Sequence, residues 1–186
     1  IEDEMKKFKC STCFCAIDAC KGYWNIVVDE SSRKHTGFST PFGNYEWCRM
    51  PMGMRNSASH YQKAMHDVLG DLLHDEGVSV YIDDVIVYAK NEDELFTLIS
   101  KVLQRLADAN FMLKPTKCEM CRNQIKWCGH QIDAKGITAD PNKIDGLVSM
   151  HPPEKMDELI TFVAAANWLR KFIPGFAELA APLQAL

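Results

Sequence analysis

The sequence predicts an α+β fold, in which an antiparallel sheet is backed by helices and a small helical region follows. The runs Val78–Ile82 and Val85–Tyr88 are rich in β-branched and aromatic residues and flank the turn formers Asp83 and Asp84, the pattern of two strands joined by a turn. Two other segments carry apolar residues at helical spacing. After Gly136 the composition changes to short helical stretches separated by prolines.

The predicted sheet begins with the apolar run Phe14–Ile17, which ends at Asp18. A second apolar run, Tyr23–Val28, follows after a short polar stretch and has the composition of another strand. We therefore expect Asp18 to lie where one strand gives way to the next.

The patterns of two segments predict amphipathic helices, which we expect to cover the sheet. In Ser57–His74, apolar residues recur at steps of three, four and one, and the pattern ends near Gly77. The same pattern recurs in Asp93–Asn110, with Asn91 as its N-cap. Two helices on one side of a sheet that contains a hairpin make a layered α+β domain.

A helical region closes the sequence. Asp140-Pro141 is an N-cap followed by a first-turn proline, which predicts a short helix running to about Met150. Pro152-Pro153 interrupts the chain. A second helix carries the apolar residues of Leu159–Leu169, and Pro174-Gly175 ends it.

The composition is that of an ordinary globular protein. The 186 residues are 47% hydrophobic and 25% charged, with a formal net charge of −4 at pH 7. No apolar run approaches the ~20 residues that span a bilayer and no secretory signal opens the sequence, so we expect a soluble intracellular protein. Residues 111–131 are locally basic, with four Lys or Arg against one Glu. This stretch fits a phosphate-binding surface and an ordinary charged surface equally well.

Eight cysteines raise the question of disulfides or zinc. Without a sign of secretion, reduced thiols are the default. The pairs Cys10/Cys13 and Cys118/Cys121 have the spacing of zinc ligands, but more than a hundred residues separate them. We therefore favour small buried cysteines over a four-thiolate zinc site.

The acidic pair Asp83-Asp84, together with Asp18, suggests a metal site. Like charges held close together on rigid strands repel, and a divalent cation relieves that repulsion. Magnesium takes oxygen ligands and commonly binds through one or two carboxylates together with substrate phosphates. The alternative is an ordinary polar turn, because Asp is a common turn former.

Six ordered blocks of residues carry a resemblance to a known family. They are Ala16–Tyr23, Arg49–Ala58, Tyr81–Asp84, Leu113–Cys118, Trp127–His130 and Asn167–Phe176, the last followed by Ala181–Leu183. In order and spacing they resemble the palm and thumb of reverse transcriptases. The similarity is greatest to the Metaviridae-like pol polyproteins of gypsy-type long-terminal-repeat retrotransposons.

The resemblance implies template-directed nucleotidyl transfer, in which a primer 3′-hydroxyl attacks the α-phosphorus of a deoxynucleoside triphosphate. Asp18, Asp83 and Asp84 match the family's catalytic acids, which hold two Mg²⁺ ions, with Mn²⁺ as a substitute. Lys117 matches a lysine proposed to protonate the departing pyrophosphate, and a solvated surface lysine is its alternative.

Two further sets of residues match the family's substrate contacts. Nucleotide-binding positions fall on Ala19, Tyr23, Met52 and Gly53, with Tyr23 as the ring that excludes a 2′-hydroxyl. Primer-binding positions fall on Tyr81, Ile82, Trp127, Gly129 and His130. An ordinary strand aromatic, a turn glycine and a core tryptophan are the alternatives for Tyr23, Gly53 and Trp127.

By the same resemblance, residues 1–135 are a polymerase-type palm with incomplete fingers and residues 136–186 a thumb-like helical region. The implied partners are an RNA or DNA template with its primer, deoxynucleoside triphosphates and the remainder of a pol polyprotein (fingers, ribonuclease H and integrase), with no membrane. The implied location is a cytoplasmic virus-like particle. Because few residues precede Asp18, we expect the basic fingers to be missing and the isolated chain to polymerise poorly. The alternative is a truncated, non-catalytic module that binds nucleic acid or has a structural role.

Overall fold

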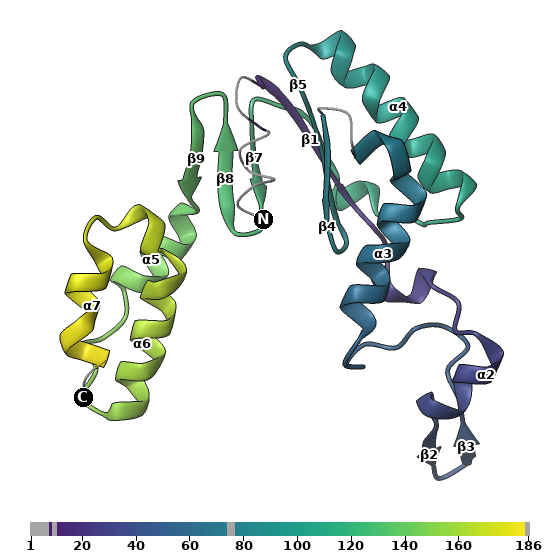
Figure 1. Ribbon diagram of the computed structural model, residues 1–186, viewed down its shortest axis with the longest axis horizontal. Helices are drawn as coiled ribbons and strands as arrows, with labels where there is room; N and C mark the ends of the chain where they lie inside the picture. Colours follow the sequence, from purple (N-terminus) through teal and green to yellow (C-terminus); the bar gives the residue numbers. More distant parts are fainter. Residues whose placement is uncertain (1–7, 9–10, 74–76, 185–186) are drawn as a thin grey trace.

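An antiparallel sheet with the strand order β4-β5-β1-β6 forms the centre of the computed structural model (Figure 1). The structure describes residue 8 and residues 11–73 and 77–184. Its strands are β1 (Cys13–Asp18), β2 (Phe38–Thr40), β3 (Gly43–Tyr45), β4 (Val78–Tyr81), β5 (Asp84–Ala89), β6 (Glu119–Arg122), β7 (Gln124–Trp127), β8 (His130–Asp133) and β9 (Gly136–Ala139). Strands β2 and β3 form a separate hairpin, and β7, β8 and β9 form a second small sheet.

The helices are α2 (Glu30–Arg33), α3 (Ser57–Leu69), α4 (Glu92–Asp108), α5 (Pro141–Val148), α6 (Met156–Trp168) and α7 (Phe176–Gln184). Helices α3 and α4 cover one face of the central sheet, α5, α6 and α7 form a group at the C-terminal end of the chain, and the short α2 lies beside the β2–β3 hairpin (Figure 1). Short 3₁₀ helices occur at Gly22–Asn25, Lys34–Thr36, Gly70–Leu73, Pro115–Lys117 and Arg170–Phe172. The predicted α+β class is confirmed.

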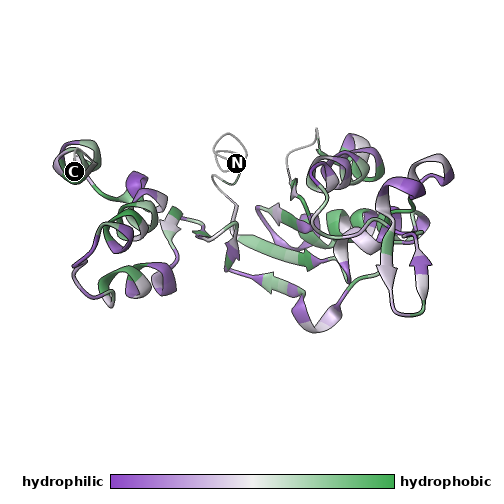
Figure 2. Ribbon diagram, turned by 90° about the horizontal axis from the view of Figure 1, so that it is seen from below, coloured by the Kyte–Doolittle hydropathy of each residue, from purple (hydrophilic) through white to green (hydrophobic). Residues whose placement is uncertain are grey.

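Alternation along the strands gives the central sheet two different faces. On one face, Ile17, Val85 and Val87 join a buried core with apolar residues of α3 and α4. On the other face, Phe14 and Ile86 join a second core with residues of β7 and β8. Hydrophobic colour follows the strands of the central sheet in Figure 2.

The predicted hairpin and most of the predicted helices are confirmed. Strands β4 and β5 pair as Tyr81↔Asp84, so Ile82 and Asp83 form a two-residue loop. Helix α4 begins where Asn91 was expected to cap it, and α3 ends earlier than expected. The reason is Gly70, which has a φ of +48° and donates its backbone N–H to the carbonyl of His66.

The prediction of a strand at Tyr23–Val28 was wrong. Residues Gly22–Asn25 form a 3₁₀ helix, which follows the left-handed backbone of Lys21 at φ 59°. The Asn25 side chain donates to the carbonyls of Cys20 and Gly22, both at 2.9 Å, and so stabilises a turn. Local hydrogen bonding outweighed the apolar composition of this run.

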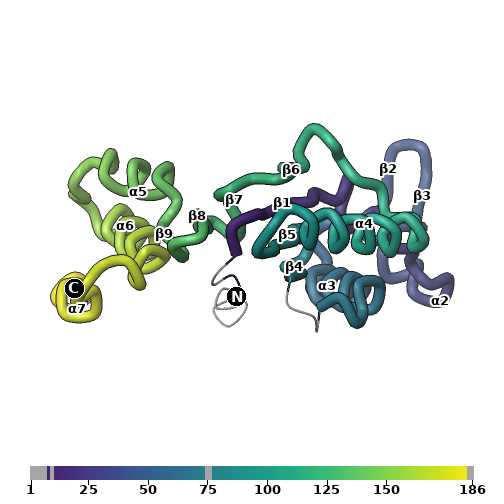
Figure 3. Tube along the Cα trace, turned by 90° about the horizontal axis from the view of Figure 1, so that it is seen from above, coloured from purple at the N-terminus to yellow at the C-terminus, as the bar shows by residue number. Residues whose placement is uncertain are grey.

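The chain is elongated, with α5, α6 and α7 at one end and the β2–β3 hairpin at the other (Figure 3). Strand β9 pairs with β8 along its whole length, so hydrogen bonds connect the helical end to the preceding hairpin. The division into residues 1–135 and 136–186 stays a prediction. None of the helices within the described ranges has the length and apolar character needed to cross a membrane.

Replacing Asn91 by alanine is expected to destabilise the protein by about 1 kcal/mol. The Asn91 side chain accepts a hydrogen bond from the Glu94 backbone N–H at 2.9 Å, and alanine leaves that donor without its cap. Urea unfolding measures the change. Asn123→Ala, at an exposed position between β6 and β7, is the control, and an equal loss in both variants would contradict the capping role.

Candidate active site

Two of the predicted catalytic acids face each other across neighbouring strands. Asp18 is the last residue of β1, Asp84 is the first residue of β5, and the two are register partners. Register partners in antiparallel strands point to the same side of a sheet. Alternation from the buried Ile17 and Val85 places both acids on the face opposite α3 and α4.

Asp83 occupies the second position of the β4–β5 turn and is exposed. The first position, Ile82, has a φ of +56°, whereas Asp83 does not have a positive φ, the combination found in type II′ turns. A Cβ atom added to Gly22 would lie 3.7 Å from Oδ2 of Asp83. The Asp83 carboxyl therefore lies beside the chain segment that immediately follows Asp18.

Lys117 provides a positive charge at this site. Its Nζ lies 3.2 Å from Oδ2 of Asp18, while the Lys114 backbone N–H donates to the Asp18 carbonyl at 3.0 Å. The 3₁₀ helix Pro115–Lys117 therefore holds the lysine against the end of β1. Four predicted catalytic residues from three distant segments of the sequence thus gather at one end of the central sheet.

The pKa of the Asp84 carboxyl is raised, first by partial burial and then by the negative charges of Asp83 and Asp18, with Lys117 acting in the opposite direction. The three carboxylates are thus close enough to repel one another. Within the part of the chain that the structure describes, no group of three or more His, Cys, Asp and Glu side chains is arranged to hold a metal ion. Instead, the Asp18 carboxylate is paired with the Lys117 ammonium.

Asp84→Asn is expected to increase the free energy of unfolding at pH 7 by at most about 1 kcal/mol, because solvent still reaches the Asp84 side chain and screens the repulsion. A raised native-state pKa means that the folded protein binds the proton more tightly than the unfolded chain. The stabilisation from protonating Asp84 is therefore present below the ordinary Asp pKa of about 3.9 and lost as the pH rises through the raised value. Unfolding midpoints from pH 3 to pH 8 measure this difference.

The gain from Asp84→Asn should disappear at the acid end of that pH series, because protonated Asp84 and asparagine are both neutral. Asp67→Asn, at an exposed position of α3, is the matched control and should show a much smaller pH-dependent difference. An Asp84→Asn gain that grows as the pH falls would contradict the proposed repulsion.

The predicted nucleotide-binding residues lie in two loops. Ala19 is buried directly after β1, and Tyr23 lies in the following 3₁₀ helix with its ring against that of Tyr61, at a centroid distance of 5.3 Å. Met52 and Gly53 precede α3 and are both exposed. Gly53 has a φ of +88° and open space around its Cα, so its backbone conformation, rather than crowding, favours glycine there.

The predicted primer-binding residues lie in two hairpins. Tyr81 and Ile82 belong to the β4–β5 hairpin, and Tyr81 is exposed. Trp127, by contrast, is 3% exposed in the second core, with its Nε1–H directed to the Asp84 carbonyl at 3.5 Å. The Trp127 ring therefore lies in the core, as the alternative interpretation proposed. From there it supports the strand that carries Asp84.

The turn between β7 and β8 contacts the C-terminal helices. A Cβ atom on Gly129, whose φ is +74°, would lie 3.0 Å from the Trp168 ring. The His130 ring, itself buried, lies 6.0 Å from that of Trp168 and 5.8 Å from that of Phe172. The close approach that requires glycine at position 129 is therefore made to α6.

The zinc alternative falls partly outside the described residues, because Cys10 is not among them. Of its other members, Cys118 directs its thiol to the Lys114 carbonyl and Cys121 is exposed. The described cysteines are free thiols. Burial, and then the nearby Asp84, raise the pKa of Cys128 to about 12, which keeps this thiol protonated.

Two residues that support the acids were not among the predicted site residues. Gln62 of α3 hydrogen-bonds through its side-chain amide to Val80 of β4 and to Ile82, the first residue of the β4–β5 turn. Asn25 accepts from the Met112 backbone N–H at 3.2 Å and so ties the loop after Asp18 to the segment that leads to Lys117. Both are polar residues next to apolar ones in the sequence, and only the folded arrangement identifies their partners.

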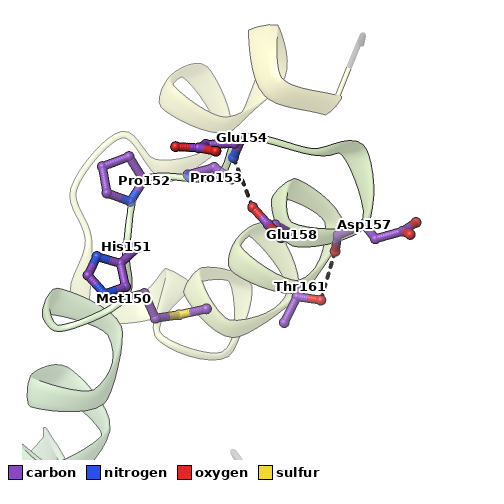
Figure 4. A pocket seen from close by; sticks show the side chains of 8 residues that line it. All are labelled: Met150, His151, Pro152, Pro153, Glu154, Asp157, Glu158 and Thr161. Atoms are coloured by element: carbon purple, nitrogen blue, oxygen red, sulfur yellow. Dashed lines mark hydrogen bonds between the residues drawn. The ribbon is translucent and has the colours of Figure 1, made fainter.

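A hollow of about 740 Å³ lies among the C-terminal helices (Figure 4). Its wall includes Glu154, Asp157 and Glu158, which would repel a phosphate. The Glu158 side chain accepts from the Glu154 backbone N–H at 2.9 Å, so it satisfies a donor in the segment just before α6. The residues that line this hollow all belong to the C-terminal helical region, so it is separate from the acids of the central sheet.

Residues 2–132 match the family model described as reverse transcriptase (RNA-dependent DNA polymerase). The retrovirus-related Pol polyprotein from transposon 297 of Drosophila melanogaster is 38% identical over 170 residues, which make up 91% of this chain and 16% of that protein. The transposon Tf2-3 polyprotein of Schizosaccharomyces pombe is 33% identical over 186 residues, all of this chain and 14% of the polyprotein. The chain thus spans only a small part of the length of these relatives.

Solved structures agree with this match. The foamy viral protease-reverse transcriptase in complex with an RNA/DNA hybrid has a TM-score of 0.85 at 25% identity, over 94% of this chain and 24% of that one. The dRH form of the same viral protein with double-stranded DNA has a TM-score of 0.87 at 25% identity, over 94% of this chain and 30% of that one. The chain belongs to the reverse transcriptase (RNA-dependent DNA polymerase) family.

Proposed function

We propose that this chain is the polymerase-site segment of a reverse transcriptase, which adds deoxynucleotides to a primer 3′-hydroxyl on an RNA or DNA template. The observation that carries the proposal is the register pairing of Asp18 with Asp84, with Asp83 in the adjoining turn. Phosphoryl transfer requires positioning and charge neutralisation more than a nucleophilic side chain, and a group of acids suits that requirement.

The donor set of Asp18, Asp83 and Asp84 fits Mg²⁺, because hard divalent cations prefer carboxylate oxygens. Two bound Mg²⁺ ions, or Mn²⁺ in their place, would activate the attacking oxygen and stabilise charge on the leaving group. For the three carboxylates to close around cations, Asp18 has to leave Lys117. The freed ammonium would then face the pyrophosphate leaving group, where it would neutralise charge and donate a proton.

The remaining predicted contact residues would have different roles in this proposal. Tyr23 would limit the space at the sugar, because its ring packs edge-on against the fully buried Tyr61. Ala19, Met52 and Gly53 would line the nucleotide site, and Tyr81, Ile82, Gly129 and His130 the primer site. Trp127 would act indirectly, by supporting Asp84 through its contact with the Asp84 carbonyl.

The proposed partners follow from the relatives. The foamy viral structures hold double-stranded DNA or an RNA/DNA hybrid, so a primer–template duplex is the nucleic acid proposed for this chain. Within the basic stretch of residues 111–131, Lys117 pairs with Asp18 and Lys126 pairs with Asp140 at 2.8 Å. Lys114 and Arg122 are exposed and available to phosphates. We further propose that the segment acts within a gypsy-type pol polyprotein, in a cytoplasmic virus-like particle, with deoxynucleoside triphosphates as substrates.

The test is extension of a labelled DNA primer on an RNA template, with Mg²⁺, with Mn²⁺ and with a chelator. The proposal predicts incorporation that requires the divalent ion and follows the template sequence. Binding of the primer–template without incorporation under any of these conditions would overturn catalysis by this chain and support the non-catalytic module.

A further inference from the structure

We infer that Gln62 is a positioning residue that fixes the turn carrying Asp83 and Asp84. The inference rests on the proposed function of those acids, and it concerns a helix residue that makes no predicted contact with substrate. Gln62 lies in α3, is half-buried, and reaches the β4–β5 hairpin with both ends of its side-chain amide.

The amide of Gln62 pairs with β4 as a neighbouring strand would. Its Oε1 accepts from the Ile82 backbone N–H at 2.5 Å, and its Nε2 donates to the Val80 carbonyl at 3.2 Å. In an extended strand, these two backbone groups point to the same side, one on each side of Tyr81. Strand β4 is at the edge of the sheet, so that side has no strand partner among the residues that the structure describes.

The turn needs such support because of the residue at its first position. Ile82 has a φ of +56°, a region that β-branched side chains rarely adopt and that turns usually fill with glycine. A hydrogen bond to the Ile82 N–H stabilises this conformation relative to conformations in which the N–H points away from Gln62. Asp83 follows directly in the turn and Asp84 begins β5, so the orientation of the Ile82 peptide sets the direction of the Asp83 carboxylate relative to that of Asp84.

Helix α3 also supports the opposite side of the site. Tyr61, the neighbour of Gln62, is fully buried and packs against Tyr23, which lies in the loop after Asp18. One turn of α3 therefore contacts both chain segments that supply the acids. A shift of this helix turn would move the hairpin acids relative to Asp18.

The test compares Gln62→Met, which keeps the length of the side chain and removes both hydrogen bonds, with wild type. Amide hydrogen exchange at Ile82 should accelerate at least about tenfold when its acceptor is removed. Mn²⁺ affinity, measured by titration with electron paramagnetic resonance, should fall about fivefold to tenfold. Gln104→Met, at an exposed position of α4, is the control and should change neither quantity. If Gln62→Met does not fold, Gln62→Asn, which keeps the amide on a shorter side chain, takes its place with the same expectations.

A second measurement separates positioning from simple packing. In an Ile82→Gly background, glycine adopts the positive φ without strain, so Gln62→Met should lower Mn²⁺ affinity by less than twofold. An undiminished loss in that background would show that Gln62 only packs α3 against β4, and would overturn the inference. Faster exchange at Ile82 with unchanged Mn²⁺ affinity would overturn it as well.

Failure of this inference is distinguishable from failure of the proposed function. If Asp83→Asn abolishes Mn²⁺ binding and Gln62→Met does not alter it, the acids bind metal without help from Gln62. If Asp83→Asn itself leaves Mn²⁺ binding intact, the metal site is wrong and the role of Gln62 in it is overturned too.

Discussion

Asp83→Asn is expected to reduce nucleotide incorporation about a thousandfold, which corresponds to about 4 kcal/mol of lost transition-state stabilisation. Asparagine keeps the shape of the side chain but removes the negative charge that would hold a divalent cation near the reacting phosphate. Because Asp83 is exposed in the turn, its replacement should leave the fold intact. Single-nucleotide incorporation on an RNA template measures the rate.

The control for this loss is Asp145→Asn, which removes one negative charge from an exposed position of α5. It should incorporate nucleotide at the wild-type rate, because its carboxylate lies in the C-terminal helices and not at the central sheet. Incorporation by Asp83→Asn within a factor of ten of wild type would mean that this carboxylate does not take part in the chemistry.

Leu95→Ala is expected to reduce the free energy of unfolding by about 2–5 kcal/mol. Leu95 is 0% exposed in the core between α4 and the central sheet, so alanine leaves a cavity as well as losing buried apolar surface. Urea unfolding monitored by circular dichroism measures the loss. The neighbouring Phe96→Ala removes a side chain that is 54% exposed and should cost less than about 1 kcal/mol. Equal costs for the two variants would contradict the assignment of Leu95 to the core.

The elements that the sequence predicted are those with a strong local signal. The β4–β5 hairpin and α4 combine residue type, periodicity and an end signal, and each of these agrees with the tertiary structure. The Asn91 cap and the Asp140 cap, whose side chain accepts from the Asn142 backbone N–H, were visible for the same reason. Helix α7 was not predicted, and Pro182 within it is a residue that ordinarily argues against a helix.

The elements that the sequence did not reveal depend on distant partners. Strand β6 has an exposed side-chain pattern and is held by pairing with β1 across a register shift, which no local periodicity predicts. The β7–β8–β9 sheet consists of four-residue strands, whose period is too short to distinguish from a loop. The prediction of a strand at Tyr23–Val28 failed for the opposite reason, because local hydrogen bonds through Asn25 outweighed the apolar composition of this run.

In the candidate site, too, some features were predictable from the sequence and others were not. The acids were identifiable because Asp83-Asp84 lies between two apolar runs and Asp18 lies at the end of another, and the family resemblance added Lys117. The pairing of Lys117 with Asp18 was not predictable, because 99 positions separate the two residues. Gln62 was not predictable either, because the apolar periodicity of its helix indicates only which of its neighbours are buried.

The central claim is that Asp18, Asp83 and Asp84 together bind divalent cations, and a Mn²⁺ titration monitored by electron paramagnetic resonance tests it most directly. The titration compares wild type with the variant that carries asparagine at all three positions. The account predicts saturable Mn²⁺ binding by wild type and affinity at least about tenfold weaker in the variant. Equal affinity in the two proteins would contradict the account.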